Sequence, residues 1–190
     1  MVNLKTLIEG IYTGYSFRNK VVHSEVGDLP VIQMKNVDYK HYSINPQLTT
    51  IDSSKIKDNS YLMKNDILFV AKGSNNCAIE YVLDLSRAIA SSAFFIIRPD
   101  RNKVVPAYLA WCINQPPVQQ YLKENTVGTY TPNINKNVIE GIMVSLPSKS
   151  IQEKIAMIDQ LRKKEYLLME LISQKREIAI DALLLNMANK

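Results

Sequence analysis

The sequence has little cysteine and no long apolar run. Cys77 and Cys112 lie far apart and form no CxxC pair, which excludes a disulfide-rich scaffold and a cysteine-rich zinc site. So few cysteines are typical of a reducing compartment, and we expect a cytoplasmic protein. No stretch reaches the roughly 18 consecutive apolar residues that a membrane span needs. Residues 1–5 lack an apolar core followed by a cleavage site, so we expect no secretory signal.

The sequence also lacks a block of like charge. Lys and Arg exceed Asp and Glu by 23 to 18, giving a net charge of +5. This mild basic excess permits a polyanionic partner but does not identify one. The length of 190 residues is enough for one or two domains with a buried core.

Motifs for catalysis are missing as well. The sequence contains no Walker A loop, no G-x-G-x-x-G and no G-x-S-x-G, so it lacks the usual phosphate-cradling loops and the hydrolase nucleophile turn. His23 and His41 stand in separate polar contexts without partners at metal-ligand or acid–base spacing. We therefore expect no metal site, no cofactor and no catalytic residue in this chain.

The part of the chain before Pro106 is typical of strands and turns, and the part after it of helices. Short runs rich in β-branched and aromatic residues predict strands, and polar clusters containing Gly, Pro and Asn bound them; the expected strands are 21–22, 30–34, 67–71, 80–83 and 93–97. Apolar spacing, proline positions and terminal glycines predict short helices over 4–9, 106–113 and from 117, and a short helix that turns into a strand over 138–147. The pattern indicates an α+β fold, a mixed α/β domain with a twisted, largely antiparallel sheet and short helices.

The C-terminal segment predicts one long helix. It contains no Gly or Pro from Ser148 to about Asn186, and Ser150 with Glu153 fits a capping box. Such a helix spans roughly 60 Å, too long to be buried along its whole length by one small domain. We therefore expect part of its apolar stripe to contact another helix; the stripe residues are Ile151, Ile155, Ile158, Leu161, Leu168, Leu171, Ile172, Ile178 and Leu185.

Three polar loops are candidates for contact with nucleic acid. Arg and Asn side chains can read base edges, whereas Lys, Ser, Thr and Tyr more often contact phosphates. Each loop could equally be a simple turn, since Gly and Asn are common in turns. The candidate residues are Tyr15, Arg18, Asn19 and Lys20 in the first loop, Lys72, Gly73, Ser74, Asn75 and Asn76 in the second, and Thr129, Tyr130, Thr131 and Lys136 in the third.

Taken in order, several segments resemble half of the DNA-specificity (S) subunit of type I restriction–modification systems. Residues 62–73 are similar to the most recognisable motif of that family, a strand that enters a glycine loop. The other similar segments are 7–18, 30–37, 90–99, 105–111, Gly128 with Thr129, and Leu146-Pro147 with Gln152 and Ile155. The sequence departs from the common family pattern at 129–131, and it holds one half where full-length relatives hold two.

The resemblance implies a target-recognition domain over residues 1–147 and a spacer and dimerisation helix over 148–190. The helix is expected to pair as an antiparallel coiled coil, as the two halves of full-length relatives do. A single half leaves three working forms open, the chain alone, a homodimer and a pair with another half. We expect the homodimer, which by symmetry would read a two-part site on double-stranded DNA. It also implies a modification (methyltransferase) subunit that carries S-adenosylmethionine and methylates adenine, and a restriction/translocase subunit that uses ATP and Mg²⁺. This chain would then be non-catalytic and would bind none of those cofactors.

Another interpretation fits the residues without the resemblance. A helical dimerising module with a mixed α/β domain, engaged in protein–protein contacts and without DNA specificity, would show the same long helix. Such a module has no need of the 62–73 motif or of the ordered Pro147 and Gln152, and these features favour the DNA-specificity interpretation.

Overall fold

The computed structural model describes residues 1–56, 60–128 and 132–189. It divides into two compact units, Met1–Ala156 and Met157–Lys190, which we call the first unit and the helical unit. The first unit extends to Ala156 and so includes the beginning of the long helix.

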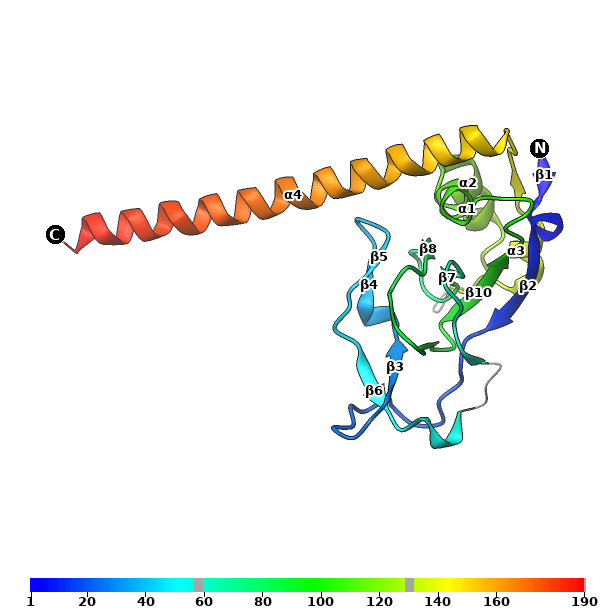
Figure 1. Ribbon diagram of the computed structural model, residues 1–190, viewed down its shortest axis with the longest axis horizontal. Coiled ribbons are helices and arrows are strands. Elements are labelled where there is room, and N and C mark those ends of the chain that lie inside the picture. Colours follow the sequence, from blue (N-terminus) through cyan, green and yellow to red (C-terminus); the bar gives the residue numbers. More distant parts are fainter. Residues whose placement is uncertain (57–59, 129–131, 190) are drawn as a thin grey trace. The chain divides into compact units, whose positions relative to one another are not determined.

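The described residues of the first unit form four small sheets built from short strands (Figure 1). The largest has the order β2-β10-β7-β8 and is antiparallel throughout; its strands are β2 (Ile8–Thr13), β10 (Phe94–Pro99), β7 (Ile67–Val70) and β8 (Ala78–Glu80). A second sheet has the order β6-β3-β9, with β3 antiparallel to β6 and parallel to β9; its strands are β6 (Thr49–Ile51), β3 (Leu29–Ile32) and β9 (Ile89–Ala90). Two antiparallel pairs complete the set, β1 (Val2–Asn3) with β11 (Met143–Val144) and β4 (Val37–Asp38) with β5 (Ser43–Ile44).

Helices follow the strands in the chain, as the sequence predicts. They are α1 (Pro106–Ile113), α2 (Pro116–Glu124), α3 (Lys136–Glu140) and α4 (Lys149–Ala188), with short 3-10 turns at η1 (Leu4–Leu7), η2 (Met34–Asn36) and η3 (Ser53–Lys55). Both α1 and α2 begin with proline in the first turn, where the missing N–H has no intrahelical partner to lose. The mixed α/β fold with largely antiparallel sheets and a long C-terminal helix is therefore confirmed.

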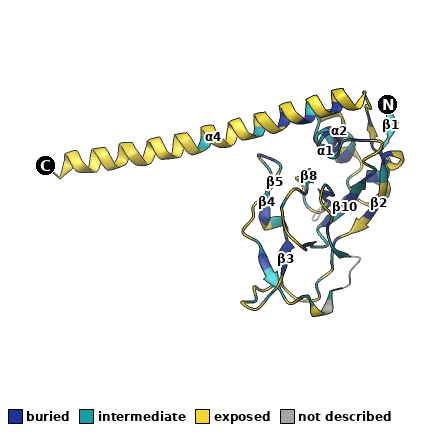
Figure 2. Ribbon diagram, in the orientation of Figure 1, coloured by how far each residue is buried: buried dark blue, intermediate teal, exposed yellow. Residues whose placement is uncertain are grey.

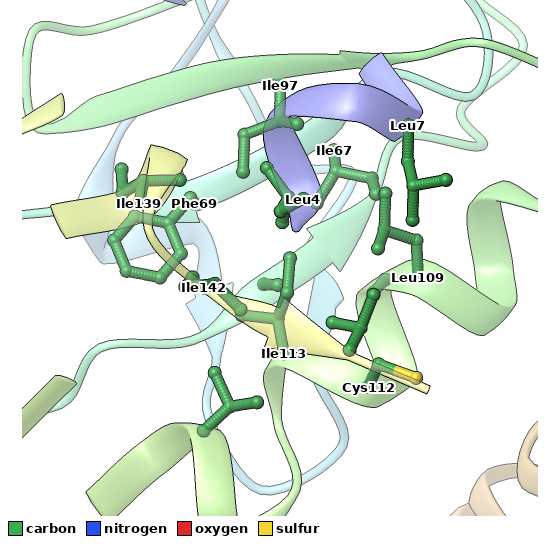
Figure 3. Packing of buried hydrophobic residues seen from close by; sticks show 14 of the residues in the cluster. Leu4, Leu7, Ile67, Phe69, Ile97, Leu109, Cys112, Ile113, Ile139 and Ile142 are labelled. Atoms are coloured by element: carbon green, nitrogen blue, oxygen red, sulfur yellow. The ribbon is translucent and has the colours of Figure 1, made fainter. Parts of the chain in front are cut away.

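The main core lies between the largest sheet and helix α1. Leu4 and Leu7 of η1 meet Ile67 and Ile97 from the sheet and Leu109 from α1 (Figure 3). All five side chains are almost completely buried. The burial of these residues fixes η1, the sheet and α1 against one another, because each methylene group removed from water contributes about 0.8 kcal/mol.

Three local expectations were wrong. The helix expected over 4–9 is only the turn Leu4–Leu7, and the chain continues as strand β2 because Ile8–Thr13 pairs with β10. Residues 21–22 form no strand. The long helix begins at Lys149, so Ser150 lies inside it and is not its N-cap.

Candidate nucleic-acid interface

The second candidate loop leaves the sheet at the end of β7 and is closed by its own side chains. The Asn76 Nδ2 atom donates to the carbonyl oxygen of Val70 at 2.9 Å. Gly73 has φ +93°, a conformation that side-chain-bearing residues rarely adopt. These features expose Ser74 and Asn75 at the tip of the loop.

The third candidate loop is hydrogen-bonded to the second. Lys72 forms an antiparallel bridge with Asn133, and the Gly73 N–H donates to the carbonyl oxygen of Pro132 at 2.8 Å. Asn133 also exchanges two backbone hydrogen bonds with Val127. Segments that are far apart in the sequence therefore lie side by side as one irregular ladder.

Lys136 stands at the end of this ladder, as the first residue of α3. The Asn135 side chain accepts a hydrogen bond from the Val138 N–H at 3.1 Å, which is the usual N-cap interaction. The Lys136 side chain is half exposed, and its nearest carboxylate is Glu140 at 3.9 Å. The predicted residues Thr129, Tyr130 and Thr131 lie outside the residues that the structure describes.

The first candidate loop is anchored by a close approach of two backbone segments. The Tyr15 N–H donates to the carbonyl oxygen of Ala90 at 2.7 Å. A Cβ atom at Gly14 would lie 2.1 Å from the carbonyl oxygen of Ser91, so only glycine fits there. Beyond this anchor the ring of Tyr15 meets that of Phe17 edge to face, with centroids 4.8 Å apart.

The predicted residues of the first loop fall into two groups, those beyond Tyr15 and Tyr15 itself. Arg18, Asn19 and Lys20 are exposed, and no described contact joins them to the other two loops. Tyr15, in contrast, shares an open pocket of about 540 Å³ with Lys136 of the third loop. The pocket thus connects the first loop with the ladder that holds the second and third.

Two residues of this pocket, Tyr61 and Arg98, lie outside all three candidate loops. Tyr12 begins the first candidate loop and follows the buried Ile11 on β2, and this alternation marks its side chain as outward-facing. Arg98 ends an apolar run that predicts a buried strand, and no sequence signal separates it from that run.

A buried ion pair holds Arg98 in place. Its Nε and Nη2 atoms donate to the two carboxylate oxygens of Asp66, each at 2.9 Å. Asp66 is 1% exposed, and its carboxylate also accepts from the Met63 N–H at 2.8 Å. The hydrogen bonds that Arg98 donates to Asp66 raise the pKa of Arg98 above its ordinary value, so Arg98 remains a cation at every physiological pH.

The two thiols are buried and protonated. Burial raises the pKa of the Cys77 thiol to about 12 and that of Cys112 to about 11, so neither supplies a thiolate nucleophile near neutral pH. Over the described ranges, no three His, Cys, Asp or Glu side chains are grouped so that they could hold a metal ion.

Most of the predicted stripe on α4 is exposed. Exposure ranges from 47% at Leu168 to 69% at Ile178, and Figure 2 shows the helical unit almost entirely in the colour of exposed residues. Ile155 differs because it packs against the main core of the first unit. The other stripe residues are Ile151, Ile158, Leu161, Leu171, Ile172 and Leu185, all about half exposed or more.

A search for membrane spans among the described helices found none with the length and hydropathy needed to cross a bilayer.

Three solved structures resemble this chain over at least 93% of its length. The S subunit from M. genitalium matches with a TM-score of 0.61 at 14% identity, covering 93% of this chain and 42% of that chain. The HsdS subunit from Thermoanaerobacter tengcongensis matches with a TM-score of 0.63 at 17% identity, covering 95% and 44%. A chain from a structural study of type I R-M complex assembly and conformational transition matches with a TM-score of 0.68 at 16% identity, covering 93% and 45%. These likenesses show the fold, and the present chain spans less than half the length of each of these proteins.

No curated protein matches this chain in sequence. A family profile does match, that of the type I restriction modification DNA specificity domain, and it covers residues 1–175. This range contains all three candidate loops, the pocket and most of α4. The chain therefore belongs to the family of type I restriction modification DNA specificity domains.

Proposed function

We propose that this chain reads the DNA sequence for a type I restriction–modification complex, in which separate subunits methylate adenine and cleave DNA. The observation that carries the proposal is the ladder from Val127 through Asn133 to Lys72. It joins two loops into one exposed surface on a rigid sheet, and binding residues are typically presented in this way.

The side chains on this surface suit both parts of DNA recognition. Asn75 can donate to and accept from an adenine edge in the major groove, and Arg18, on the separate first loop, can donate twice to guanine. Lys72, Ser74 and Lys136 are suited to phosphate oxygens, which position a protein on the duplex without reading its sequence. Much of the phosphate contact would come from the modification subunit, so we expect the isolated chain to bind DNA weakly and in a salt-sensitive way.

The proposed working form is a homodimer held together by α4. The helix runs for 40 residues, about 60 Å at 1.5 Å per residue, and its apolar side chains beyond Ala156 are exposed. In an antiparallel pair, these side chains would be buried between the two helices. Since a two-fold dimer presents the same surface twice, it would read a two-part palindromic site with a gap set by the helix.

We assign the methylation and cleavage reactions to the modification and restriction subunits. We expect S-adenosylmethionine on the modification subunit, and ATP and Mg²⁺ on the restriction subunit. The contribution of this chain is to place those subunits at a chosen sequence, and we propose that it binds none of the three ligands.

Methylome mapping tests this function directly. Cells that carry this chain with its modification subunit should show adenine methylation at a two-part palindromic site. Asn75→Ala and Arg18→Ala should change the methylated sequence, whereas Lys123→Ala, an exposed cation at the end of α2, should leave it unchanged. An unaltered pattern in both loop variants would contradict the assignment of the loops, and a site with one part or without symmetry would contradict the homodimer.

A further inference from the structure

The pocket that joins Tyr15 to Lys136 lies along the edge of the largest sheet. Strand β2 is the outermost strand of that sheet (Figure 1), and residues 11–16 form one wall of the pocket. The remaining lining comes from Ser60, Tyr61, Ile96, Arg98 and Lys136. The volume of about 540 Å³ lies within the range of about 300–1,000 Å³ typical of sites for small molecules.

The aromatic rings of the pocket are held in fixed positions. The guanidinium carbon of Arg98 lies 5.0 Å from the ring centroid of Tyr12, and that of Arg87 lies 5.5 Å from the ring centroid of Tyr61. Tyr15 is fixed by its edge-to-face contact with Phe17. Each of these rings therefore has a partner that favours its observed orientation, which reduces the ordering that a ligand would require.

The polar groups of the pocket are mostly hydrogen-bond donors. Within the part of the chain that the structure describes, the lining contains two cations, three tyrosines and no carboxylate. Asp66 takes the Nε and Nη2 donors of Arg98, and the described residues provide no acceptor for its Nη1 atom. The hydroxyls of Tyr12, Tyr15 and Tyr61 likewise have no protein acceptor there. The Asp66 carboxylate already pairs with Arg98 behind the lining, so Lys136 supplies most of the uncompensated positive charge. A lining with several donors and no carboxylate of its own suits an anionic oxygen ligand.

We propose that this pocket binds a phosphate group of the DNA backbone together with its sugar. Arg98 and Lys136 face the phosphate charge, the tyrosine hydroxyls donate to its oxygens, and the rings contact the sugar. This inference rests on the proposed function. It adds a contact beside β2 that is independent of sequence and separate from the second loop, with Tyr12, Tyr61 and Arg98 as new DNA-contacting residues.

The position of the pocket favours a DNA strand over a free nucleotide. Tyr15 belongs to the first loop, and Lys136 begins α3, three residues after Asn133 of the ladder that carries the second and third loops. A strand held by these loops would pass the mouth of the pocket.

Because phosphate contacts are independent of sequence, the test needs no knowledge of the target site. The full chain is titrated with a random duplex from about 50 mM salt upward, where phosphate contacts dominate binding. Tyr12→Phe/Tyr61→Phe removes two hydroxyls and keeps both rings, and it should weaken binding about tenfold without changing the salt dependence. Lys136→Ala should weaken binding and reduce the slope of log K against log salt by about 0.9, the value for one phosphate contact.

Matched controls separate the possible outcomes. Lys123→Ala removes one cation and Tyr166→Phe removes one tyrosine hydroxyl outside the pocket, and both variants should bind as the wild type does. If wild type binds the duplex and the pocket variants bind equally well, the pocket inference is wrong and the proposed function stands. If the wild type binds no duplex at low salt, the DNA-binding proposal fails and this inference fails with it. Displacement of the duplex by millimolar dAMP from wild type but not from Lys136→Ala would overturn the assignment to a DNA strand.

Discussion

The two units of this protein use apolar residues in opposite ways. In the first unit Phe69 is completely buried and lies in a core shared by sheet and helices. In the helical unit Leu171 is 48% exposed, although its side chain is similarly apolar. The apolar residues of the first unit stabilise its own fold, whereas those beyond Ala156 are available to a partner.

The largest expected change in the free energy of unfolding comes from comparing a buried with an exposed apolar residue. Phe69→Ala should lower the free energy of unfolding of the first unit by about 3–5 kcal/mol, because it opens a cavity in the core. Leu171→Ala should change it by less than about 0.5 kcal/mol and should instead weaken self-association. Chemical denaturation and sedimentation of both variants measure the two effects, and equal destabilisation by both would remove the distinction between the units.

The buried ion pair gives the next largest effect. Asp66→Ala leaves Arg98 without its carboxylate partner and should destabilise the first unit by about 3–5 kcal/mol. Asp181→Ala on the exposed helix should stay within about 0.5 kcal/mol of the wild type. Thermal denaturation of the two variants compares them, and a mild effect at Asp66 would mean that the pair is not needed to hold the sheet.

Gln152 connects the beginning of α4 to the rest of the first unit. This buried side chain accepts from the Val105 N–H at 2.9 Å and donates to the Pro147 carbonyl oxygen at 2.8 Å. Gln152→Ala should therefore cost about 1–3 kcal/mol, whereas Gln160→Ala in the helical unit should cost almost nothing. A chain cut after Ala156 should be a folded monomer, and one cut after Pro147 should be less stable. Equal melting temperatures for the two truncated chains would place the boundary at Pro147.

The smallest expected effect is a loss of stability at low pH, which depends on Asp28. Asp28 accepts two hydrogen bonds from Ser53, at 2.9 Å from its N–H and at 2.7 Å from its hydroxyl. The hydroxyl contact is the larger cause that lowers the pKa of Asp28 below its ordinary 3.8. The contact stabilises the fold above that ordinary value and is lost as the pH falls through the lowered pKa. The stability difference between wild type and Ser53→Ala should therefore shrink from about pH 6 to about pH 3; a constant difference would show that Asp28 does not titrate with folding.

Local patterns in the sequence were enough for most of the elements. The apolar run at 67–71 predicts β7, and Pro106 and Pro116 predict the starts of α1 and α2. The absence of Gly and Pro after Ser148 predicts α4. Such signals are local, because they depend on backbone conformations and spacings within a few residues. The short helix expected over 4–9 failed because pairing of β2 with β10 outweighed local preference.

The sequence predicted the separate loops of the candidate site but not the contacts between them. The sequence marked three polar loops, but it could not show that Gly73 donates to Pro132 or that Tyr15 and Lys136 share a pocket. Arg98 lies at the end of an apolar run and has no local signal of its own.

The sequence by itself determined the kinds of element, the long helix with its apolar stripe, and the resemblance that the family profile bears out. Only the tertiary structure decided which loops contact one another and that Arg98 and Lys136 line the same pocket. It also decided that Gln152 belongs to the first unit. The physical reason is that strand register and loop contacts join residues far apart in the chain, and their geometry depends on the packing of the whole core.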